Sequence, residues 1–252
     1  MIIFASDLDN TLIYSYKHNI GNKKRSVELY QLKEISFITD KTFSLLQEVK
    51  RKALFVPVTT RSIGQYNRID LGIGDIKYAL VCNGGVLLVN GEKDLLWYNK
   101  SLELIKPSLD ELKKGISILE KEPLRKFDIR FIENLFIFTK CENPQKIINN
   151  LKSRLDIKLI EVLNNGEKIY ILPKALSKGS AIKRFKEYIN ADMIISAGDG
   201  EFDISMIENS DIGIIPMDFK WQINSINNSV LRNTSKKLFS EFVLEKTLKF
   251  LI

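Results

Sequence analysis

The chain has 252 residues, of which 44% are hydrophobic and 27% are charged, with 13 glycines and 6 prolines. This composition is typical of a folded globular protein and excludes the disordered, collagen-like and disulfide-scaffold classes. The 38 basic and 31 acidic residues give a net charge of +7, which favours an anionic partner.

The first third of the chain predicts buried strands and one helix. Continuous apolar runs predict strands covered on both faces, as in parallel sheets, at residues 2–6, 53–58 and 78–82. Between the first two runs, apolar residues recur at helical spacing over 43–49, after the N-cap candidates Thr39 and Asp40. Residues 14–38 form a long connection that we interpret as a β-hairpin flap.

The middle of the chain has a different order of predicted elements. Asn90-Gly91 is a hairpin signal between apolar stretches at 86–90 and 94–98. A helix at 109–119, with Ser108 and Glu111 as a capping box, and a second one after Asn143-Pro144 are each followed by two strands. The strands are expected at residues 127–132, 135–139, 157–162 and 168–172. This order predicts a small α+β domain over residues 87–172.

The last third returns to the pattern of the first. A helix beginning near Ser177 precedes apolar runs at 193–197 and 212–215, and a further helix closes the chain after Phe239. Buried strands that alternate with amphipathic helices predict a doubly wound, mostly parallel, Rossmann-like α/β core. We expect the core to comprise residues 1–86 and 173–252, with hinges near Gly84-Gly85 and Pro173.

The rare residues exclude several kinds of chemistry. His18 is the single histidine, and Cys82 and Cys141 are the two cysteines, so a four-ligand Cys/His zinc site cannot be built. His18 lies in a lysine-rich stretch without a nucleophile elbow, which argues against a Ser-His-Asp hydrolase. Nucleic acid is a disfavoured partner, because the chain shows no helix-turn-helix, zinc-finger or RNA-binding aromatic pattern. The apolar runs are too short to span a bilayer, and Asp7 interrupts the first one, so we expect a cytoplasmic protein.

Polar residues follow the predicted strands, where ligands of open parallel sheets collect. They are Asp7, Thr59, Asn83 and Asp199. Carboxylates gathered at one edge of a sheet repel each other unless a cation compensates them, and Mg²⁺ prefers oxygen ligands. Asp7 and Asp9 are two residues apart, so in extended backbone their side chains share a face. Alone, this pair could equally be a turn in which Asp and Asn cap the backbone.

The order of the motifs is more specific than any one of them. Asp7-Leu8-Asp9-Asn10-Thr11, Thr59-Thr60-Arg61, Lys178-Gly179 and Gly198-Asp199-Gly200-Glu201-Phe202-Asp203 resemble the four motifs of the haloacid dehalogenase (HAD) superfamily. The segment between the second and third motifs resembles the α+β (type C2B) cap of subfamily IIB, the Cof-type and sucrose-phosphatase-like branch. Val81-Cys82-Asn83-Gly84-Gly85 also resembles a segment of that branch.

The resemblance implies roles for individual residues. Asp7 would be the nucleophile that forms an aspartyl-phosphate, and Asp9 the general acid and base. Thr59, Thr60 and Lys178 would bind the transferring phosphoryl group. Asp7, Asp9 (through its backbone carbonyl), Asp199 and Asp203 would hold Mg²⁺. Arg61 and Asn83 are candidates for contact with the substrate or the cap.

Two positions depart from the branch. Phe202 replaces the asparagine common before the last aspartate, and Thr60 replaces the glycine of Thr-Gly-Arg. The implied function is a Mg²⁺-dependent phosphatase acting on a small phosphorylated metabolite, plausibly a sugar phosphate. One alternative is a phosphomannomutase-like phosphomutase, which needs a second phosphate site from the cap cations Arg125, Lys126, Arg130 and Lys140. The other is a catalytically idle HAD-like binding or regulatory protein. The sequence does not indicate the oligomeric state.

Overall fold

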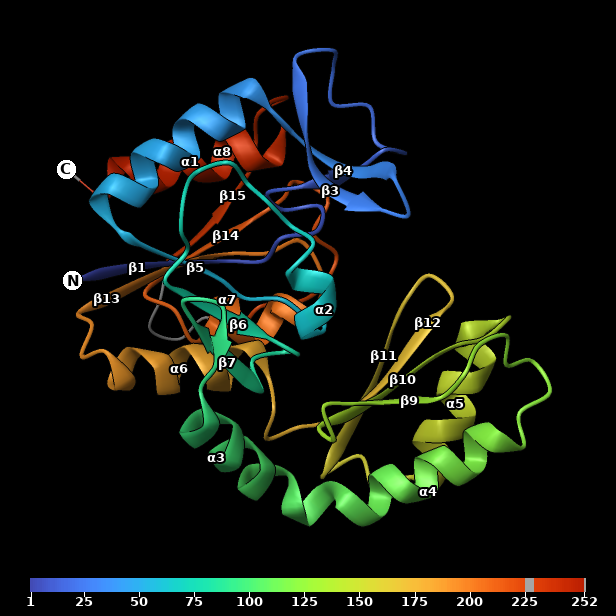
Figure 1. Cartoon of the computed structure of the whole chain (residues 1–252). Helices are drawn as coiled ribbons and strands as arrows, with labels where there is room; N and C mark the ends of the chain where they lie inside the picture. The colour runs from blue at the N-terminus through green and yellow to red at the C-terminus, as the bar shows by residue number, and fades with distance from the viewer. Residues whose placement is uncertain (225–228, 252) are drawn as a thin grey trace. The chain divides into compact units, whose positions relative to one another are not determined.

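A computed structural model describes residues 1–224 and 229–251 of the chain. The chain divides into two compact units (Figure 1), unit 1 comprising Met1–Lys93 and Lys178–Ile252, and unit 2 comprising Asp94–Ser177. Within the described residues, no helix combines the length and the apolar character needed to cross a membrane.

Unit 1 is built on a five-stranded parallel sheet in the order β15-β14-β13-β1-β5. Its strands are β1 (Ile2–Ser6), β5 (Leu54–Pro57), β13 (Met193–Ala197), β14 (Ile212–Ile215) and β15 (Ser229–Arg232). The predicted doubly wound α/β core is therefore confirmed. The chain runs from β1 to β5 on one side and later returns to β13 on the other, so the order reverses at β1. At such a switch point the carboxyl ends of an open sheet leave a crevice for ligands.

Helices cover both faces of this sheet. On one face α1 (Asp40–Lys52) lies beside α8 (Phe239–Lys249), as Figure 1 shows, and both bury apolar residues against Phe4 of β1 and Ile195 of β13. Thr39 is the N-cap of α1, as predicted, and accepts a hydrogen bond from the amide of Thr42. The other helices of this unit are α2 (Ile63–Tyr66), α6 (Lys178–Tyr188), η2 (Glu201–Asp203) and α7 (Ile204–Glu208).

Two smaller antiparallel sheets complete unit 1. The first contains β2 (Tyr14–Ser15), β3 (Lys24–Tyr30) and β4 (Lys33–Thr39), the hairpin expected in residues 14–38. The second contains β6 (Tyr78–Val81), β7 (Val86–Val89) and β8 (Glu92–Lys93). β6 continues the main sheet beyond β5 through a single parallel bridge between Val58 and Leu80.

The strand predicted at 94–98 is wrong. Asp94 instead accepts a hydrogen bond from the amide of Trp97 and caps α3 (Leu95–Ile105). The hairpin at Asn90-Gly91 does form, between β7 and β8. Because β7 pairs with β6, the hairpin stays in unit 1, and the units part after Lys93 rather than after residue 86. Gly84 and Gly85 lie in the turn between β6 and β7.

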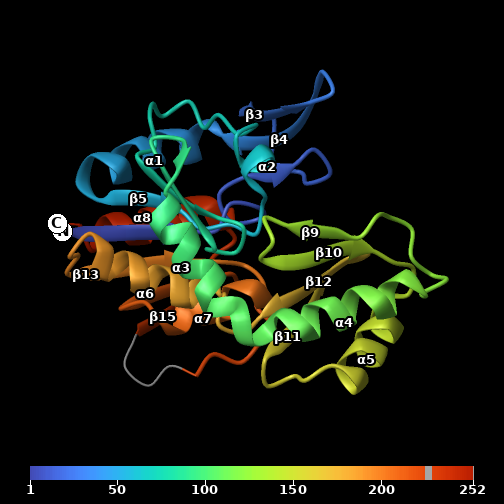
Figure 2. The same cartoon turned by 60° about the horizontal axis from the view of Figure 1, so that its bottom comes forward.

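Unit 2 is an α+β unit. Its antiparallel sheet has the order β11-β12-β10-β9. The strands are β9 (Arg130–Ile132), β10 (Phe136–Lys140), β11 (Ile160–Asn165) and β12 (Lys168–Pro173). α4 (Leu109–Glu120) and α5 (Pro144–Arg154) lie on the same side of this sheet (Figure 2) and share one apolar core with it. A short 3-10 helix, η1 (Lys106–Ser108), joins α3 to α4.

The predicted capping box of α4 does not form. The Ser108 hydroxyl donates to the carbonyl of Leu159, and Glu111 accepts from the amide of Asp156. Both side chains therefore tie the helix to the segment before β11 instead of closing its own first turn. That unit 2 acts as a cap stays a prediction.

Candidate active site

Polar residues of the motifs meet at the carboxyl edge of the sheet in unit 1. Asp7 follows β1, Thr59 follows β5, and Asp199 follows β13, and these three strands are neighbours. The amide of Asp7 donates to the carbonyl of Ala197, which fixes the end of β1 against β13. The sheet order thus brings together residues that are up to 192 positions apart in the sequence.

A buried ammonium group joins two of the carboxylates. The Lys178 side chain is only 2% exposed, and its Nζ lies 2.6 Å from Oδ1 of Asp7 and 2.6 Å from Oδ1 of Asp203. Both aspartates are buried as well. A lysine is seldom buried this completely unless it is paired, so its position indicates a built site and not a surface charge.

Two glycines allow this close packing. A Cβ on Gly179, which follows Lys178 in α6, would lie 2.2 Å from the carbonyl oxygen of Ser205. A Cβ on Gly198 would lie 2.3 Å from the Cβ of Asp203. Each distance is far shorter than a van der Waals contact, so side chains at these positions would push Lys178 or Asp203 out of place.

Three carboxylates form a group that fits a hard divalent cation. Oxygens of Asp7, Asp199 and Asp203 lie within 4.8 Å of one another. Oδ2 of Asp203 accepts from the amides of Asp199 and Gly200, and Oδ1 of Asp199 accepts from the Thr11 hydroxyl at 3.2 Å. Three carboxylates against one ammonium leave an excess of negative charge, and oxygen ligands are those that Mg²⁺ prefers.

The pKa values reflect this excess. Burial raises the pKa of Asp7 well above its usual value, and Asp203 and Asp199 raise it further, while Lys178 acts in the opposite direction. The pKa of Asp199 rises to about 7, through burial first and Asp203 second. Burial lowers the pKa of Lys178, but the carboxylates of Asp203 and Asp7 outweigh it and hold the pKa above the usual range. The ammonium therefore stays charged.

Asp9 lies in a different environment from Asp7. Its side chain is 47% exposed, and both of its oxygens accept from Arg61, at 2.7 Å from Nε and 2.7 Å from Nη2. Arg61 also bonds the carboxylate of Glu28 in β3. In this conformation Arg61 is engaged by the protein itself.

The other predicted residues lie in the loops after β5 and β6. The Thr59 hydroxyl accepts from the amide of Arg61, and the Thr59 carbonyl accepts from the amide of Asn83. Thr59 and Asn83 are buried, and Thr60 is partly exposed. Sequence reasoning missed Thr11 and Glu28. Thr11 belongs to the first motif, whereas Glu28 carries no motif signal.

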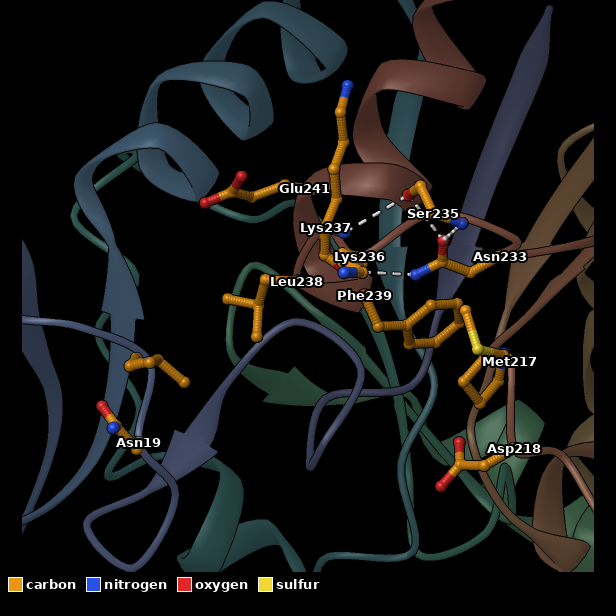
Figure 3. Close-up of a pocket in the computed structure, with 12 residues that line it drawn as sticks. Asn19, Met217, Asp218, Asn233, Ser235, Lys236, Lys237, Leu238, Phe239 and Glu241 are labelled. Carbon is orange, nitrogen blue, oxygen red and sulfur yellow. Dashed lines mark hydrogen bonds between the residues drawn. The ribbon is translucent and has the colours of Figure 1, made fainter.

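A cavity of about 610 Å³ lies elsewhere in unit 1 (Figure 3). It is lined by residues around Asn19, Met217 and Lys236, and by no residue of the four motifs. Two of the four charged side chains at its wall are paired, since Glu241 bonds Lys41 and Lys237 bonds Glu245. The motif residues, and not this cavity, therefore define the candidate active site.

The comparison with protein families agrees with the motifs. Residues 87–237 match the model of the haloacid dehalogenase-like hydrolases. The chain belongs to this family. The predicted membership, and with it the prediction of a hydrolase, is confirmed.

Individual relatives share less than a quarter of their residues with this chain. A phosphoglycolate phosphatase from Methanopyrus kandleri is 23% identical over 198 residues, which cover 76% of this chain and 82% of the relative. Sucrose-phosphatase from Synechocystis, solved with sucrose and phosphate, aligns with a TM-score of 0.70 and 17% identity over 99% of this chain and 97% of that one. A subclass IIB sugar phosphatase aligns with a TM-score of 0.60 and 14% identity over the whole of both chains. These likenesses confirm the fold.

Proposed function

We propose that the protein is a Mg²⁺-dependent phosphatase that hydrolyses a small phosphorylated metabolite through an aspartyl-phosphate. The observation that carries the proposal is the buried Lys178 ammonium between Asp7 and Asp203, with Asp199 beside them. Carboxylates kept this close would repel each other without cations, and a phosphoryl group needs both a nucleophile and positive charge around its oxygens. The family membership and the phosphatase names of the relatives support the same reaction.

Asp7 is the proposed nucleophile. A carboxylate oxygen of Asp7 attacks the phosphorus atom, the bond from phosphorus to the leaving oxygen breaks, and an acyl phosphate forms on Asp7. Lys178 holds Asp7 in place and keeps a positive charge beside the phosphoryl oxygens. The hydroxyl groups of Thr59 and Thr60 offer donors at the same edge of the sheet, whereas the amide of Thr59 is bonded to the carbonyl of Leu80. Asp7, Asp199, Asp203 and the backbone carbonyl of Asp9 would hold Mg²⁺, which when bound draws charge from the phosphoryl oxygens.

Asp9 is the proposed acid and base. It gives a proton to the leaving alkoxide and then takes one from the water that attacks the phosphorus of the acyl phosphate, which releases inorganic phosphate and restores Asp7. Its partial exposure suits this role, because it must exchange a proton with substrate and water.

No observation favours the phosphomutase. In unit 2 Arg125 donates to the carbonyls of Leu119 and Phe127, and Lys126 lies between Glu142 and Glu167. Two of the four cations proposed for a second phosphate site thus have partners within their own unit.

A screen of phosphorylated metabolites with Mg²⁺ or with EDTA, read as released phosphate, tests the proposal. Turnover should require the metal, and Asp7→Asn should abolish it. Asp9→Asn should slow turnover by about 10²–10⁴-fold and accumulate phosphoenzyme, seen by mass spectrometry after an acid quench. Phosphate on the Asp7→Asn protein, or activity in that variant, would contradict the assignment. Equal activity in EDTA would contradict the metal.

A further inference from the structure

The guanidinium of Arg61 is held from two sides. Its Nε and Nη2 donate to the two oxygens of Asp9, and its Nη1 and Nη2 donate to the two oxygens of Glu28, at 2.8 and 3.0 Å. Nη1 also approaches the carbonyl of Gln65 at 3.4 Å. An arginine has five N–H donors, and these contacts use all of them. Arg61 is therefore fixed in position and orientation.

Glu28 is the buried end of this arrangement. Its side chain is 0% exposed, and it accepts hydrogen bonds from Ser36 at 2.7 Å and from Arg68 at 2.9 and 3.1 Å, in addition to those from Arg61. These partners lower its pKa even though burial alone would raise it. Burying a carboxylate costs free energy that ion pairs return only in part. A buried ion pair is therefore weak evidence for stability, and in some proteins it serves to hold a defined geometry.

The strand is irregular at this residue. The pairing of β3 with β4 shifts register on both sides of Glu28, so that an extra residue stands first on β3 and then on β4. Val27 joins the apolar core, while its neighbour Glu28 is buried and bonded to Arg61 and Arg68. The bulge is bonded to the segment after α2. Glu28 forms an isolated β-bridge with Ile69, and the amide of Asp70 donates to the carbonyl of Val27. Bulges often re-aim a side chain beside an active site.

We propose that Glu28 is a positioning residue, which fixes Arg61 so that Arg61 holds the carboxylate of Asp9 by both oxygens. The inference rests on the proposed role of Asp9 as the acid and base. A proton-transfer group must lie within hydrogen-bond reach of the leaving oxygen, and a half-exposed carboxylate rotates freely unless something holds it. Glu28 lies on β3 of the hairpin β3–β4 (Figure 1), so in this proposal the hairpin contributes to the placement of Asp9.

Glu28→Gln tests this role, because it keeps the shape of the side chain and removes its charge. Turnover is measured for aryl phosphates with good leaving groups and for alkyl phosphates, whose leaving oxygen needs a proton. Loss of positioning should slow alkyl phosphates by about tenfold or more, a part of the 10²–10⁴-fold that proton transfer contributes, and p-nitrophenyl phosphate by less than about threefold.

Ser36→Ala is the matched control, since it removes a hydrogen bond to the same carboxylate and leaves both bonds from Arg61. It should lower the melting temperature without changing the ratio of aryl to alkyl rates. Equal losses on both substrate classes in Glu28→Gln, or the same change of ratio in Ser36→Ala, would overturn the proposal.

A crystal structure of Glu28→Gln separates this inference from the proposed function. Asp9 should lose its two-oxygen contact with Arg61. An unchanged Asp9–Arg61 pair would overturn the positioning role whether or not the wild-type protein hydrolyses phosphate esters. The other outcome is that Asp9 is displaced in the Glu28→Gln structure and the wild-type protein hydrolyses no phosphate ester. It would support the positioning of Asp9 by Glu28 and contradict the proposed function.

Discussion

Replacing Lys178 by methionine should destabilise the protein far more than a change at any surface lysine. Lys178→Met keeps a side chain of similar length, so the cavity left behind is small, but the carboxylates of Asp7 and Asp203 lose a cation 2.6 Å away. Removing one partner of a buried ion pair typically costs about 3–5 kcal/mol. At about 2–4 °C per kcal/mol for a chain of this size, the melting temperature should fall by about 6–20 °C.

The control lies on the same helix. Lys186 pairs with Asp211 at 3.2 Å, and both side chains are partly exposed. An exposed pair contributes about 0.2–1 kcal/mol, so Lys186→Met should shift the melting temperature by less than about 4 °C.

Calorimetry at pH 8 and pH 5, in EDTA, measures both variants. The loss in Lys178→Met should shrink at pH 5, because Asp7, whose pKa is already raised, can then take up a proton and shed its charge. A Lys178→Met protein that melts within the range of the control at pH 8 would refute the view that this ammonium compensates the carboxylates.

Three further predictions concern packing, pH and the thiols. Gly179→Ala should cost about 1–3 kcal/mol by overpacking against Ser205, measured by urea unfolding, whereas Gly64→Ala, with open space around it, should cost far less. In EDTA the free energy of unfolding should fall as the pH rises from 5 to 8, because Asp199, with a pKa of about 7 in the folded state and near 3.8 when unfolded, loses its bound proton; a rise over this range would contradict the charge excess. Burial raises the pKa of Cys141 to about 11, so a thiol reagent at pH 8 should label this residue only after unfolding, as peptide mass spectrometry would show; rapid labelling of the native protein would contradict its burial.

The core strands could be predicted because their physics is local. A strand buried on both faces is a nearly continuous apolar run, and β1, β13 and β14 have the predicted bounds for this reason. The local sequence did not predict the structure of segments that depend on a neighbouring strand or on a capping side chain. Ser229–Arg232 has polar ends and becomes a strand by pairing with β14, and Asp94 caps a helix in a segment with the composition of a strand.

In the candidate site, too, some features follow from local sequence and others depend on distant partners. The spacing of Asp7 and Asp9 and the motif around Asp199 are visible in the sequence, because each depends on one short turn after a strand. The link from Asp9 through Arg61 to Glu28 is not visible, because it depends on a bulge and on contacts between residues 33 positions apart. The sequence did not predict that Arg61 would be engaged by two carboxylates of its own unit.

Unit 2 is inserted between the two segments of unit 1, and this order has a consequence for biosynthesis. Unit 2 is one continuous stretch, whereas β1 finds its neighbour β13 only after nearly two hundred residues have been made. A growing chain therefore holds a complete unit 2 while one edge of β1 still lacks its partner, and unpaired strand edges expose nascent chains to aggregation. A chain that stops before Lys178 would keep that edge open and leave Asp7 without its ammonium partner. Such fragments should therefore depend on chaperones more than the 252-residue chain does.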